Sequence, residues 1–376
     1  MHISEFKLER YFAKYEFSAP YLLCSSDPES FTVEELLNYE AGSLEKLKKC
    51  WLGYPETTGI EELRKEISKL YKGISPEDII VHSGGEEGIF LFMNAMLNPD
   101  DHVIAHFPAY QSLYEIARSC GCEITFWKVK EEDNWELDID FLKKNIKENT
   151  KAIIINCPHN PTGYLPSKEK FEEIIKIAKE KNILVFCDEA YRFLEYNEKD
   201  RLPAVCEFYE NAVSLGIMTK AFALPGIRIG WLATKNKKIL EQIAIFKEYT
   251  TIASNMPGQL LAVIALRNKE KILKRNLQII QSNLKILNSF FDKYKDIFNW
   301  TPPKAGTIAF LSIKLNIDIE KFCLDLVESK GVFLLPSTVY DYGNKHFRIG
   351  FGRKNMKECL EKFEEYLVLM KVSVSV

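Results

Sequence analysis

A lysine in an apolar stretch is the first residue in the sequence that could do covalent chemistry. Lys220 lies in the segment LGIMTKAFALPGIRIGW, and Arg228 follows it in the same segment. A desolvated lysine has a lowered pKa and becomes a nucleophile that forms a Schiff base with an aldehyde. Arg228 keeps its charge and suits a phosphate. A lysine whose ammonium reaches solvent along an amphipathic face is the alternative, but the surrounding residues are too apolar to favour it.

An acid at the end of an apolar segment is the second such residue. Asp188 lies in ILVFCDEAY, at positions 183–191. A carboxylate at the end of a buried strand is costly without a partner, and burial would raise its pKa. A cationic ligand would remove that cost, and Tyr191 is spaced to contact the same ligand. Taken alone, Asp188 is equally well explained as a cap of the following helix.

Two turns place further polar groups after apolar strands. Residues 83–86 (SGGE) follow the segment IIVH and open a helix, so their glycines and free backbone N–H groups favour an anion such as phosphate. This turn is neither a P-loop nor a G-x-G-x-x-G pattern. Residues 160–163 (NPTG) follow KAIIINCPH. Each segment is explained at least as well by a structural turn when it is considered alone.

Alternating apolar strands and amphipathic helices must position these residues. We expect strands at 79–82, 102–107, 123–129, 151–157 and 183–191, with helices at 84–97, 110–121, 138–146 and 167–182. Strands that are apolar on both faces and separated by helices are typical of a mostly parallel sheet covered on both sides. Ligands of such sheets bind at the carboxyl ends of the strands, which is where the polar clusters lie.

The last part of the chain has a different pattern. Residues 269–298 have apolar positions at helical spacing, and the apolar segments TIAFLSIKL, VFLLP and HFRIGFG follow. This pattern predicts a separate α+β unit, with a domain boundary inside the long helix. We expect a large domain at 41–275 and a small, discontinuous domain made of 1–40 plus 276–376.

Taken together, the polar clusters resemble those of the class I/II aminotransferases, a family of fold-type I pyridoxal-5′-phosphate enzymes. The motifs NPTG, D-x-A-Y and T-K-x₇-R-x-G stand in the order and at the separations of that family, and the resemblance extends from Gly53 to the end of the chain. It implies an α/β fold of the PLP-transferase type. The large domain would be a three-layer unit with a mostly parallel sheet, and the smaller domain would be α+β.

The resemblance also implies a role for each matching residue. Lys220 resembles the lysine that holds the cofactor aldehyde and moves a proton, and Asp188 resembles the acid that keeps the pyridine nitrogen protonated. Asn160 and Tyr191 resemble the pair that binds the phenolic oxygen. The remaining matches are the stacking residue Tyr110, the phosphate-binding residues Gly84, Gly85, Glu86, Thr219 and Arg228, the partner-directed Tyr54, and Arg348, which with Asn160 would bind the substrate carboxylate.

Two positions depart from the family pattern. Ile217 stands where many relatives have a serine that binds the phosphate, so that hydrogen bond is lost. Glu86 stands where relatives often have a hydroxyl. Because an acid facing a phosphate dianion is unfavourable, we expect Glu86 to offer its backbone N–H and to turn its side chain away.

The activity implied by the resemblance is transfer of an amino group between an L-amino acid and a 2-oxo acid by a ping-pong mechanism. Lyases and cyclases on the same scaffold share the cofactor residues, so β-elimination or a capreomycidine-synthase-like cyclisation is an alternative. Residues 17–37 resemble that synthase, and Asp27 and Glu29 would then bind a cationic side chain. A solvated loop with helix-start residues is the favoured explanation of these acids. We disfavour a non-catalytic sensor domain.

Composition excludes several classes of protein. The 376 residues are 46% hydrophobic and 27% charged, and the net charge of −3 argues against a broad nucleic-acid-binding surface. Nine scattered cysteines without a C-x-x-C pair favour a reducing compartment, and the histidines form no H-E-x-x-H metal motif. Neither a signal peptide nor a membrane span is apparent. We expect a cytoplasmic homodimer in which Tyr54 acts across the subunit interface.

Overall fold

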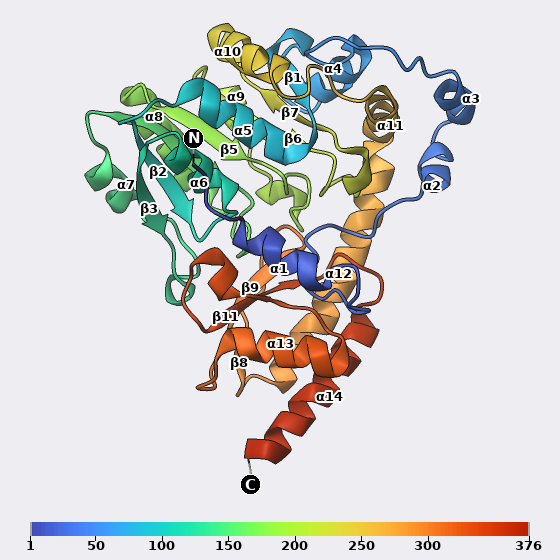
Figure 1. Cartoon of the computed structure of the whole chain (residues 1–376), viewed down its shortest axis with the longest axis vertical. Helices are drawn as coiled ribbons and strands as arrows, with labels where there is room; N and C mark the ends of the chain where they lie inside the picture. The colour runs from blue at the N-terminus through green and yellow to red at the C-terminus, as the bar shows by residue number, and fades with distance from the viewer. Residues whose placement is uncertain (1, 375–376) are drawn as a thin grey trace.

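The computed structural model describes residues 2–374 and contains two β-sheets, which Figure 1 shows one above the other. The upper sheet has seven strands and the lower sheet has four. The long helix α12 (Lys269–Lys293) runs from the upper part of the molecule to the lower part. The candidate site lies between these two parts. None of the helices in residues 2–374 combines the length and the apolar character that crossing a membrane requires.

The large sheet has the strand order β1-β7-β6-β5-β4-β2-β3. Neighbouring strands are parallel except at β7, which is antiparallel to both β1 and β6. The expected mostly parallel sheet is therefore confirmed. The sequence pattern did not predict the last two strands, which flank Lys220 in the chain. The bounds are β1 Ile79–His82, β2 His102–Phe107, β3 Glu123–Lys128, β4 Thr150–Asn156, β5 Leu184–Asp188, β6 Ala212–Ile217 and β7 Gly230–Ala233.

Helices cover both faces of the large sheet. In β4, Ile153 and Ile155 pack into a core shared with α8, whereas Ala152 and Ile154 pack into a second core shared with α5. Successive side chains of a strand point to opposite faces, so the two cores lie on opposite sides of the sheet. The three-layer α/β arrangement is confirmed. The helices are α5 Gly84–Met96, α6 Ser112–Ser119 and α10 Lys237–Glu248 with one core, and α7 Ile139–Asn145, α8 Lys168–Glu180 and α9 Val205–Phe208 with the other.

The smaller sheet is antiparallel throughout, with the order β10-β11-β9-β8. Its strands are β8 Phe298–Asn299, β9 Ile308–Ile313, β10 Leu335–Pro336 and β11 His346–Gly350, and it packs with α13 (Ile319–Lys330) and α14 (Met356–Val374). The helix predicted over 269–298 ends at Lys293 instead. The chain turns there because Phe298 pairs with Ile313 in this sheet.

The first part of the chain divides its contacts between the two sheets. Helix α1 (Lys7–Tyr15) packs against the 3₁₀ helix Ser337–Tyr340 beside the smaller sheet, and Tyr21 bridges to Val332. Helices α2 (Val33–Leu37), α3 (Ser43–Lys48) and α4 (Glu61–Ser68) pack instead against α11 (Met256–Arg267). In Figure 1, α1 lies where the upper and lower parts of the molecule meet.

Candidate active site

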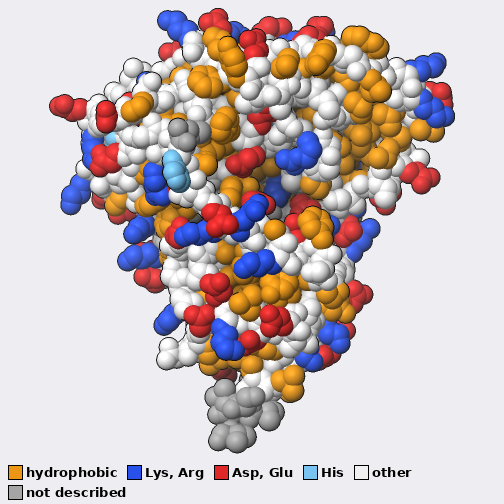
Figure 2. Space-filling model, in the orientation of Figure 1, with side chains coloured by type: hydrophobic (Ala, Val, Ile, Leu, Met, Phe, Trp, Pro, Cys, Tyr) orange, Lys and Arg blue, Asp and Glu red, His pale blue; other side chains and the backbone are white. Residues whose placement is uncertain are grey.

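A cavity of about 370 Å³ lies between the carboxyl ends of β4, β5 and β6, helix α1 and strand β11. In Figure 2, acidic and basic side chains gather where the upper and lower parts of the molecule meet. Most of the predicted site residues line this one cavity. They are Gly85, Glu86, Tyr110, Asn160, Asp188, Tyr191, Thr219, Lys220, Arg228 and Arg348. Gly84 lies just behind the lining, and Tyr54 lies outside it with 81% of its surface exposed.

Lys220 follows the end of β6 and points into the cavity. Its Nζ donates a hydrogen bond to Ser26 Oγ at 2.7 Å. Burial lowers the pKa of Lys220 to about 8, although the nearby Asp27 carboxylate partly opposes this shift. A substantial fraction of such a lysine is neutral near physiological pH, so its amine can act as a nucleophile or as a base. Ser26 is a partner that sequence reasoning missed, because no local pattern marks it.

Asp188 is the last residue of β5 and is 7% exposed. Burial raises the pKa of Asp188 to about 6, against the opposing effects of a hydrogen bond from the Ala190 amide at 3.0 Å and the charge of Lys220. The expected rise in pKa is confirmed. The segment after it is a turn rather than a helix, so capping of a following helix is not the reason for the acid. Its carboxylate faces a cavity in which a cationic group would be stabilised.

Asn156, at the end of β4, holds two parts of the site together. Its side-chain oxygen accepts a hydrogen bond from the Asn160 amide at 2.6 Å, and its side-chain nitrogen donates to the Asp188 carbonyl at 2.8 Å. The turn at 160–163 is thereby fixed to the strand that carries the acid. Tyr191, which is 2% exposed, donates from its hydroxyl to the Ser26 carbonyl at 3.3 Å. Asn156 precedes the start of the predicted turn by four residues, and that closeness was the available signal for its role.

Arg348 extends from β11 toward the opposite wall and is 2% exposed. Its Nη1 donates to the Tyr340 hydroxyl at 2.7 Å and to Asn160 Oδ1 at 3.3 Å, and its Nη2 donates to the Cys24 carbonyl at 2.9 Å. Its Nε has no hydrogen-bond partner within residues 2–374. A fixed, desolvated guanidinium with a free donor is suited to a carboxylate. Sequence reasoning did not find Tyr340, which has no motif around it.

The first turn of α5 and Arg228 form the anion-binding end of the cavity. Gly84 has φ +70°, and a Cβ there would lie 2.2 Å from Arg228 Nη2, so only glycine fits beside the guanidinium. The free N–H groups of the helix start and the arginine charge both favour a phosphate. Thr219 and Ile217 line the same end of the cavity.

Glu86 belongs to this first turn but directs one carboxylate oxygen to the Ser112 hydroxyl of α6. Its other oxygen, Oε2, is buried and has no partner in the part of the chain that the structure describes. Burial raises the pKa of Glu86. Protonation of this side chain would remove the repulsion that an anion at the helix start would otherwise meet.

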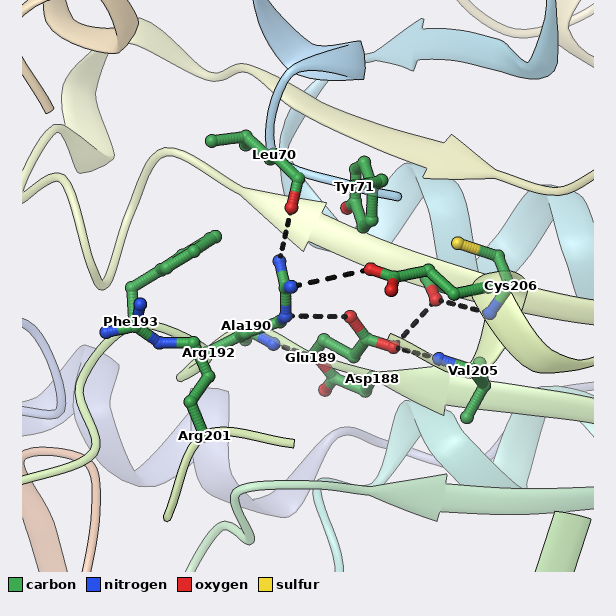
Figure 3. Close-up of polar contacts among 12 residues, drawn as sticks. Leu70, Tyr71, Asp188, Glu189, Ala190, Arg192, Phe193, Arg201, Val205 and Cys206 are labelled. Atoms are coloured by element: carbon green, nitrogen blue, oxygen red, sulfur yellow. Dashed lines mark hydrogen bonds and ion pairs between the residues drawn. The ribbon is translucent and has the colours of Figure 1, made fainter. Parts of the chain in front are cut away.

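Next to Asp188, Glu189 belongs to a separate, buried network. Figure 3 shows the side chains of Glu189 and Arg192 pointing toward each other. Glu189 Oε1 accepts hydrogen bonds from the Ser214 hydroxyl at 2.6 Å and from the Val205 amide at 2.9 Å, and its Oε2 lies 3.9 Å from Arg192 Nε. Arg192 also approaches Glu207 at 3.7 Å. Burial raises the pKa of Glu189 to about 7.

Comparisons with known proteins identify the family of the chain. The model of the family "Aminotransferase class I and II" matches residues 21–363, so the chain belongs to that family. A solved PLP-dependent aminotransferase from Streptococcus suis 89-1591 is 31% identical, with a TM-score of 0.93 and 98% of each chain covered. The aspartate aminotransferase of Sulfurisphaera tokodaii is 27% identical over 86% of this chain and 84% of its own. The capreomycidine synthase of Streptomyces vinaceus is 24% identical over 88% and 87%.

The chain is an aminotransferase, and pyridoxal 5′-phosphate is its cofactor. The residues present fit that group. The φ +70° at Gly84 lets the backbone approach Arg228 closely, which leaves an anion-binding end in a cavity of about 370 Å³. Asp188 offers a buried carboxylate and Lys220 an amine in the same cavity. The free Nε of Arg348 offers a donor for a substrate carboxylate.

Proposed function

We propose that this enzyme moves an amino group between an L-amino acid and a 2-oxo acid by a ping-pong mechanism in the described cavity. The observation that carries the proposal is the placement of Lys220, Asp188 and Arg348 around one cavity, although they come from three distant parts of the sequence. Lys220 supplies an amine with a lowered pKa, and Arg348 supplies a fixed carboxylate site. An amino acid bound between them would present its Cα to the lysine.

Pyridoxal 5′-phosphate, when bound, supplies an aldehyde that condenses with amines and a ring that accepts the electron pair released at the substrate Cα. We propose that Arg228, Thr219 and the N–H groups of Gly84, Gly85 and Glu86 hold its phosphate. Asp188 would hold the ring nitrogen in its protonated form. Asn160 and Tyr191 would bind the phenolic oxygen, and Tyr110 would pack on the ring. The support is that these side chains reach the same cavity, except for Gly84, which borders it.

In the proposed cycle, Lys220 would take a proton from the substrate Cα and pass it to the aldehyde carbon of the cofactor, and it would carry the proton the opposite way when the second substrate reacts. A pKa of about 8 suits this task, because the amine and the ammonium are both populated near physiological pH. Arg348 would bind the substrate carboxylate in a bidentate pair and set which bond at Cα faces the lysine. Tyr340 and the Cys24 carbonyl hold the guanidinium in place, so little entropy is lost when the substrate binds.

The proposal is tested by adding single L-amino acids to the holoenzyme, recording the absorbance of the cofactor and identifying the organic product. We expect a 2-oxo acid and an aminated cofactor that a second 2-oxo acid restores. Lys220→Ala should lose turnover by at least about 10³-fold. Lys238→Ala, an exposed lysine of α10, is the matched control and should keep it. Pyruvate with free ammonia, or a cyclised product, would instead identify a lyase or a cyclase.

We further propose a homodimer in which Tyr54 reaches the phosphate in the neighbouring subunit. The support is exposed apolar surface: Trp51, Leu52 and Tyr54 are 71%, 79% and 81% exposed, and Tyr249 is 88% exposed. Thr250 and Thr251, directly after Tyr249, bind Glu87 in the first turn of α5. The second exposed segment therefore adjoins the anion-binding end of the cavity. Such surfaces on one chain are typical of subunit interfaces.

Mixed dimers test this assembly. A Tyr54→Ala chain and a Lys220→Ala chain are each expected to be weakly active or inactive alone. Mixed together, they would form dimers in which one site has both Lys220 and the partner's Tyr54, so activity should return. Sedimentation that showed a fully active monomer, or mixtures without restored activity, would contradict the proposed dimer.

We propose the division into a large domain at 41–275 and a small domain of 1–40 plus 276–376. Support comes from α1, which packs against the 3₁₀ helix Ser337–Tyr340 beside the smaller sheet, and from Tyr21, which bridges to Val332. We also propose a reducing, cytoplasmic location, which is supported by nine cysteines that are all free thiols.

A further inference from the structure

Helix α1 forms one wall of the cavity and presents both apolar and acidic side chains to it. Leu8, Glu9 and Phe12 line the cavity from the helix, and Glu16 lines it from the helix end. The spacing of 8, 12 and 16 places these side chains on one helix face. The Arg348 guanidinium lies 5.9 Å from the centre of the Phe12 ring. The apolar ring therefore adjoins the arginine, with a carboxylate before it and another after it along the helix.

The carboxylates that the sequence offered for a cationic side chain are already used by the protein. Asp27 pairs with Arg353 at 2.7 Å, and Glu29 accepts a hydrogen bond from the Lys354 amide at 3.0 Å. Asp27 still lines the cavity, but its charge is balanced. Neither acid is free for a ligand.

Glu9 and Glu16 are different, because neither of them forms an ion pair within residues 2–374. No hydrogen bond or ion pair satisfies the Glu16 carboxylate among residues 2–374, and Glu9 has only a long contact of 3.4 Å from the Tyr110 hydroxyl. Burial, with Glu9 and Asp27 nearby, raises the pKa of Glu16, and the charges of Arg353 and Lys220 only partly oppose this shift. A cation placed between Glu9 and Glu16 would relieve this repulsion.

A second feature of the same cavity shows that it is built for a ligand with an anionic end. Arg348 is 2% exposed, and its Nε is without a partner in the described part of the chain. A buried guanidinium donor left free is costly unless a ligand completes it. Glu9 and Glu16 lie on the helix that adjoins this arginine. A ligand that satisfies both would carry a carboxylate, an apolar stem and a cation.

We propose that the amino donor of this enzyme is an amino acid whose side chain ends in an ammonium or guanidinium group, with its stem on Phe12 and its cation between Glu9 and Glu16. The inference rests on the proposed aminotransferase function and names its substrate class. Arg348 orients the α-carboxylate, and helix α1 selects the side chain. Because both acids are partly open to solvent, the selectivity is moderate and falls with added salt.

The test is a titration of the holoenzyme with L-ornithine, L-arginine, L-norleucine and L-glutamate, with binding read from the absorbance of the cofactor. L-norleucine has an apolar stem without the charge. We expect at least one cationic amino acid to bind about tenfold more tightly than L-norleucine at low salt. The Glu9→Gln/Glu16→Gln double variant should reduce this preference to about twofold or less and leave L-norleucine binding unchanged.

Two further variants sharpen the result. Glu34→Gln removes a charge from an exposed acid of α2 outside the cavity and should keep the full preference. Glu16→Lys should improve binding of L-glutamate while it weakens binding of the cationic amino acids. A preference that survives the double variant, or equal binding of L-norleucine and both cationic amino acids by the unchanged enzyme, would overturn the proposal.

The two proposals fail in different ways. If L-norleucine yields a 2-oxo acid and binds as well as the cationic amino acids, the substrate class is wrong and the aminotransferase reaction stands. If the cationic amino acids bind preferentially but yield ammonia or a cyclised product, the role of α1 stands and the reaction is wrong.

Discussion

Asp188 and Glu189 are neighbours in the chain, are similarly buried at 7% and 5% exposure, and both have a raised pKa. Their surroundings nevertheless differ. Glu189 has Ser214, Val205 and Arg192 around it, all from the protein itself. Asp188 has a hydrogen bond from the Ala190 amide and faces the cavity. The fold supplies Glu189 with two hydrogen bonds and an ion pair, although its Oε2 accepts no hydrogen bond among residues 2–374, whereas Asp188 faces a cavity that a ligand can fill.

This contrast shows that a shifted pKa does not by itself identify a functional acid. Burial is the main cause of the shift in both residues. What distinguishes them is whether the partner of the charged form is already in the structure. Arg192 is such a partner for Glu189, and it is held in turn by the Leu70 carbonyl at 3.2 Å. The same distinction separates Glu16, which has no ion-pair partner among residues 2–374, from Asp27, which pairs with Arg353.

The largest expected effect is on activity, in Asp188→Asn. The substituted amide keeps the shape of the side chain but cannot hold a positive charge on the ring nitrogen of the cofactor. We expect turnover of the holoenzyme to fall by about 10³-fold while the fold stays intact. Turnover and circular dichroism, measured on the same sample, test both parts. A variant that kept more than a tenth of the activity would contradict the assignment of Asp188 as the functional acid of the pair.

Glu189→Ala should affect stability instead. The substitution removes a negative charge that balances the positive charge of Arg192. It also leaves the Ser214 hydroxyl and the Val205 amide without their hydrogen-bond acceptor. We expect the free energy of unfolding to fall by about 3 kcal/mol. Glu189→Gln preserves a hydrogen-bond acceptor and should lose less. Denaturant unfolding measures the change, and turnover per folded molecule should remain within a few-fold of that of the unchanged enzyme. A large loss of turnover at unchanged stability would contradict this assignment.

Local patterns predicted much of the large sheet. β1, β2, β4 and β5 are short apolar segments bounded by helices, and their carboxyl ends carry the residues that the family motifs indicated. The pattern around Lys220 was harder to assign. β6 and β7 flank a loop in which apolar residues predominate, so the strands have little contrast with the connection between them. β7 also pairs with β1, which lies far away in the sequence.

Contacts between distant segments explain the site residues that the sequence did not reveal. Ser26 meets Lys220 only because the first segment of the chain lies across the cavity. Tyr340 holds Arg348 from a short 3₁₀ helix without a motif. Glu9 and Phe12 look like ordinary positions of a surface helix until the tertiary structure places one face of that helix on the cavity. Residue types and spacing describe single helices and strands. The roles of Ser26, Tyr340, Glu9 and Phe12 instead depend on contacts between elements that are distant in the sequence.

The smallest effect is the pH dependence of stability, and it separates the two acids most directly. The pKa of Asp188 is about 6 in the folded apoprotein, above the value of about 3.9 for an unfolded aspartate. The folded state therefore binds the proton more tightly, so this stabilising contribution is fully present below about pH 4 and is lost as the pH rises through 6. Relative to Asp188→Asn, the unchanged apoprotein should lose up to about 2 kcal/mol across that window.

Glu189, with a pKa of about 7, should produce the same trend up to a higher pH, and Glu189→Gln should remove it. Urea unfolding between pH 4 and pH 8 measures both windows, with and without saturating pyridoxal 5′-phosphate. The cofactor should abolish the fall in stability that is due to Asp188, because the ring nitrogen of the cofactor would favour the charged carboxylate. It should leave the fall that is due to Glu189 in place. If the cofactor changed the pH dependence due to both acids equally, or changed neither, the result would contradict the conclusion that the cavity distinguishes Asp188 from Glu189.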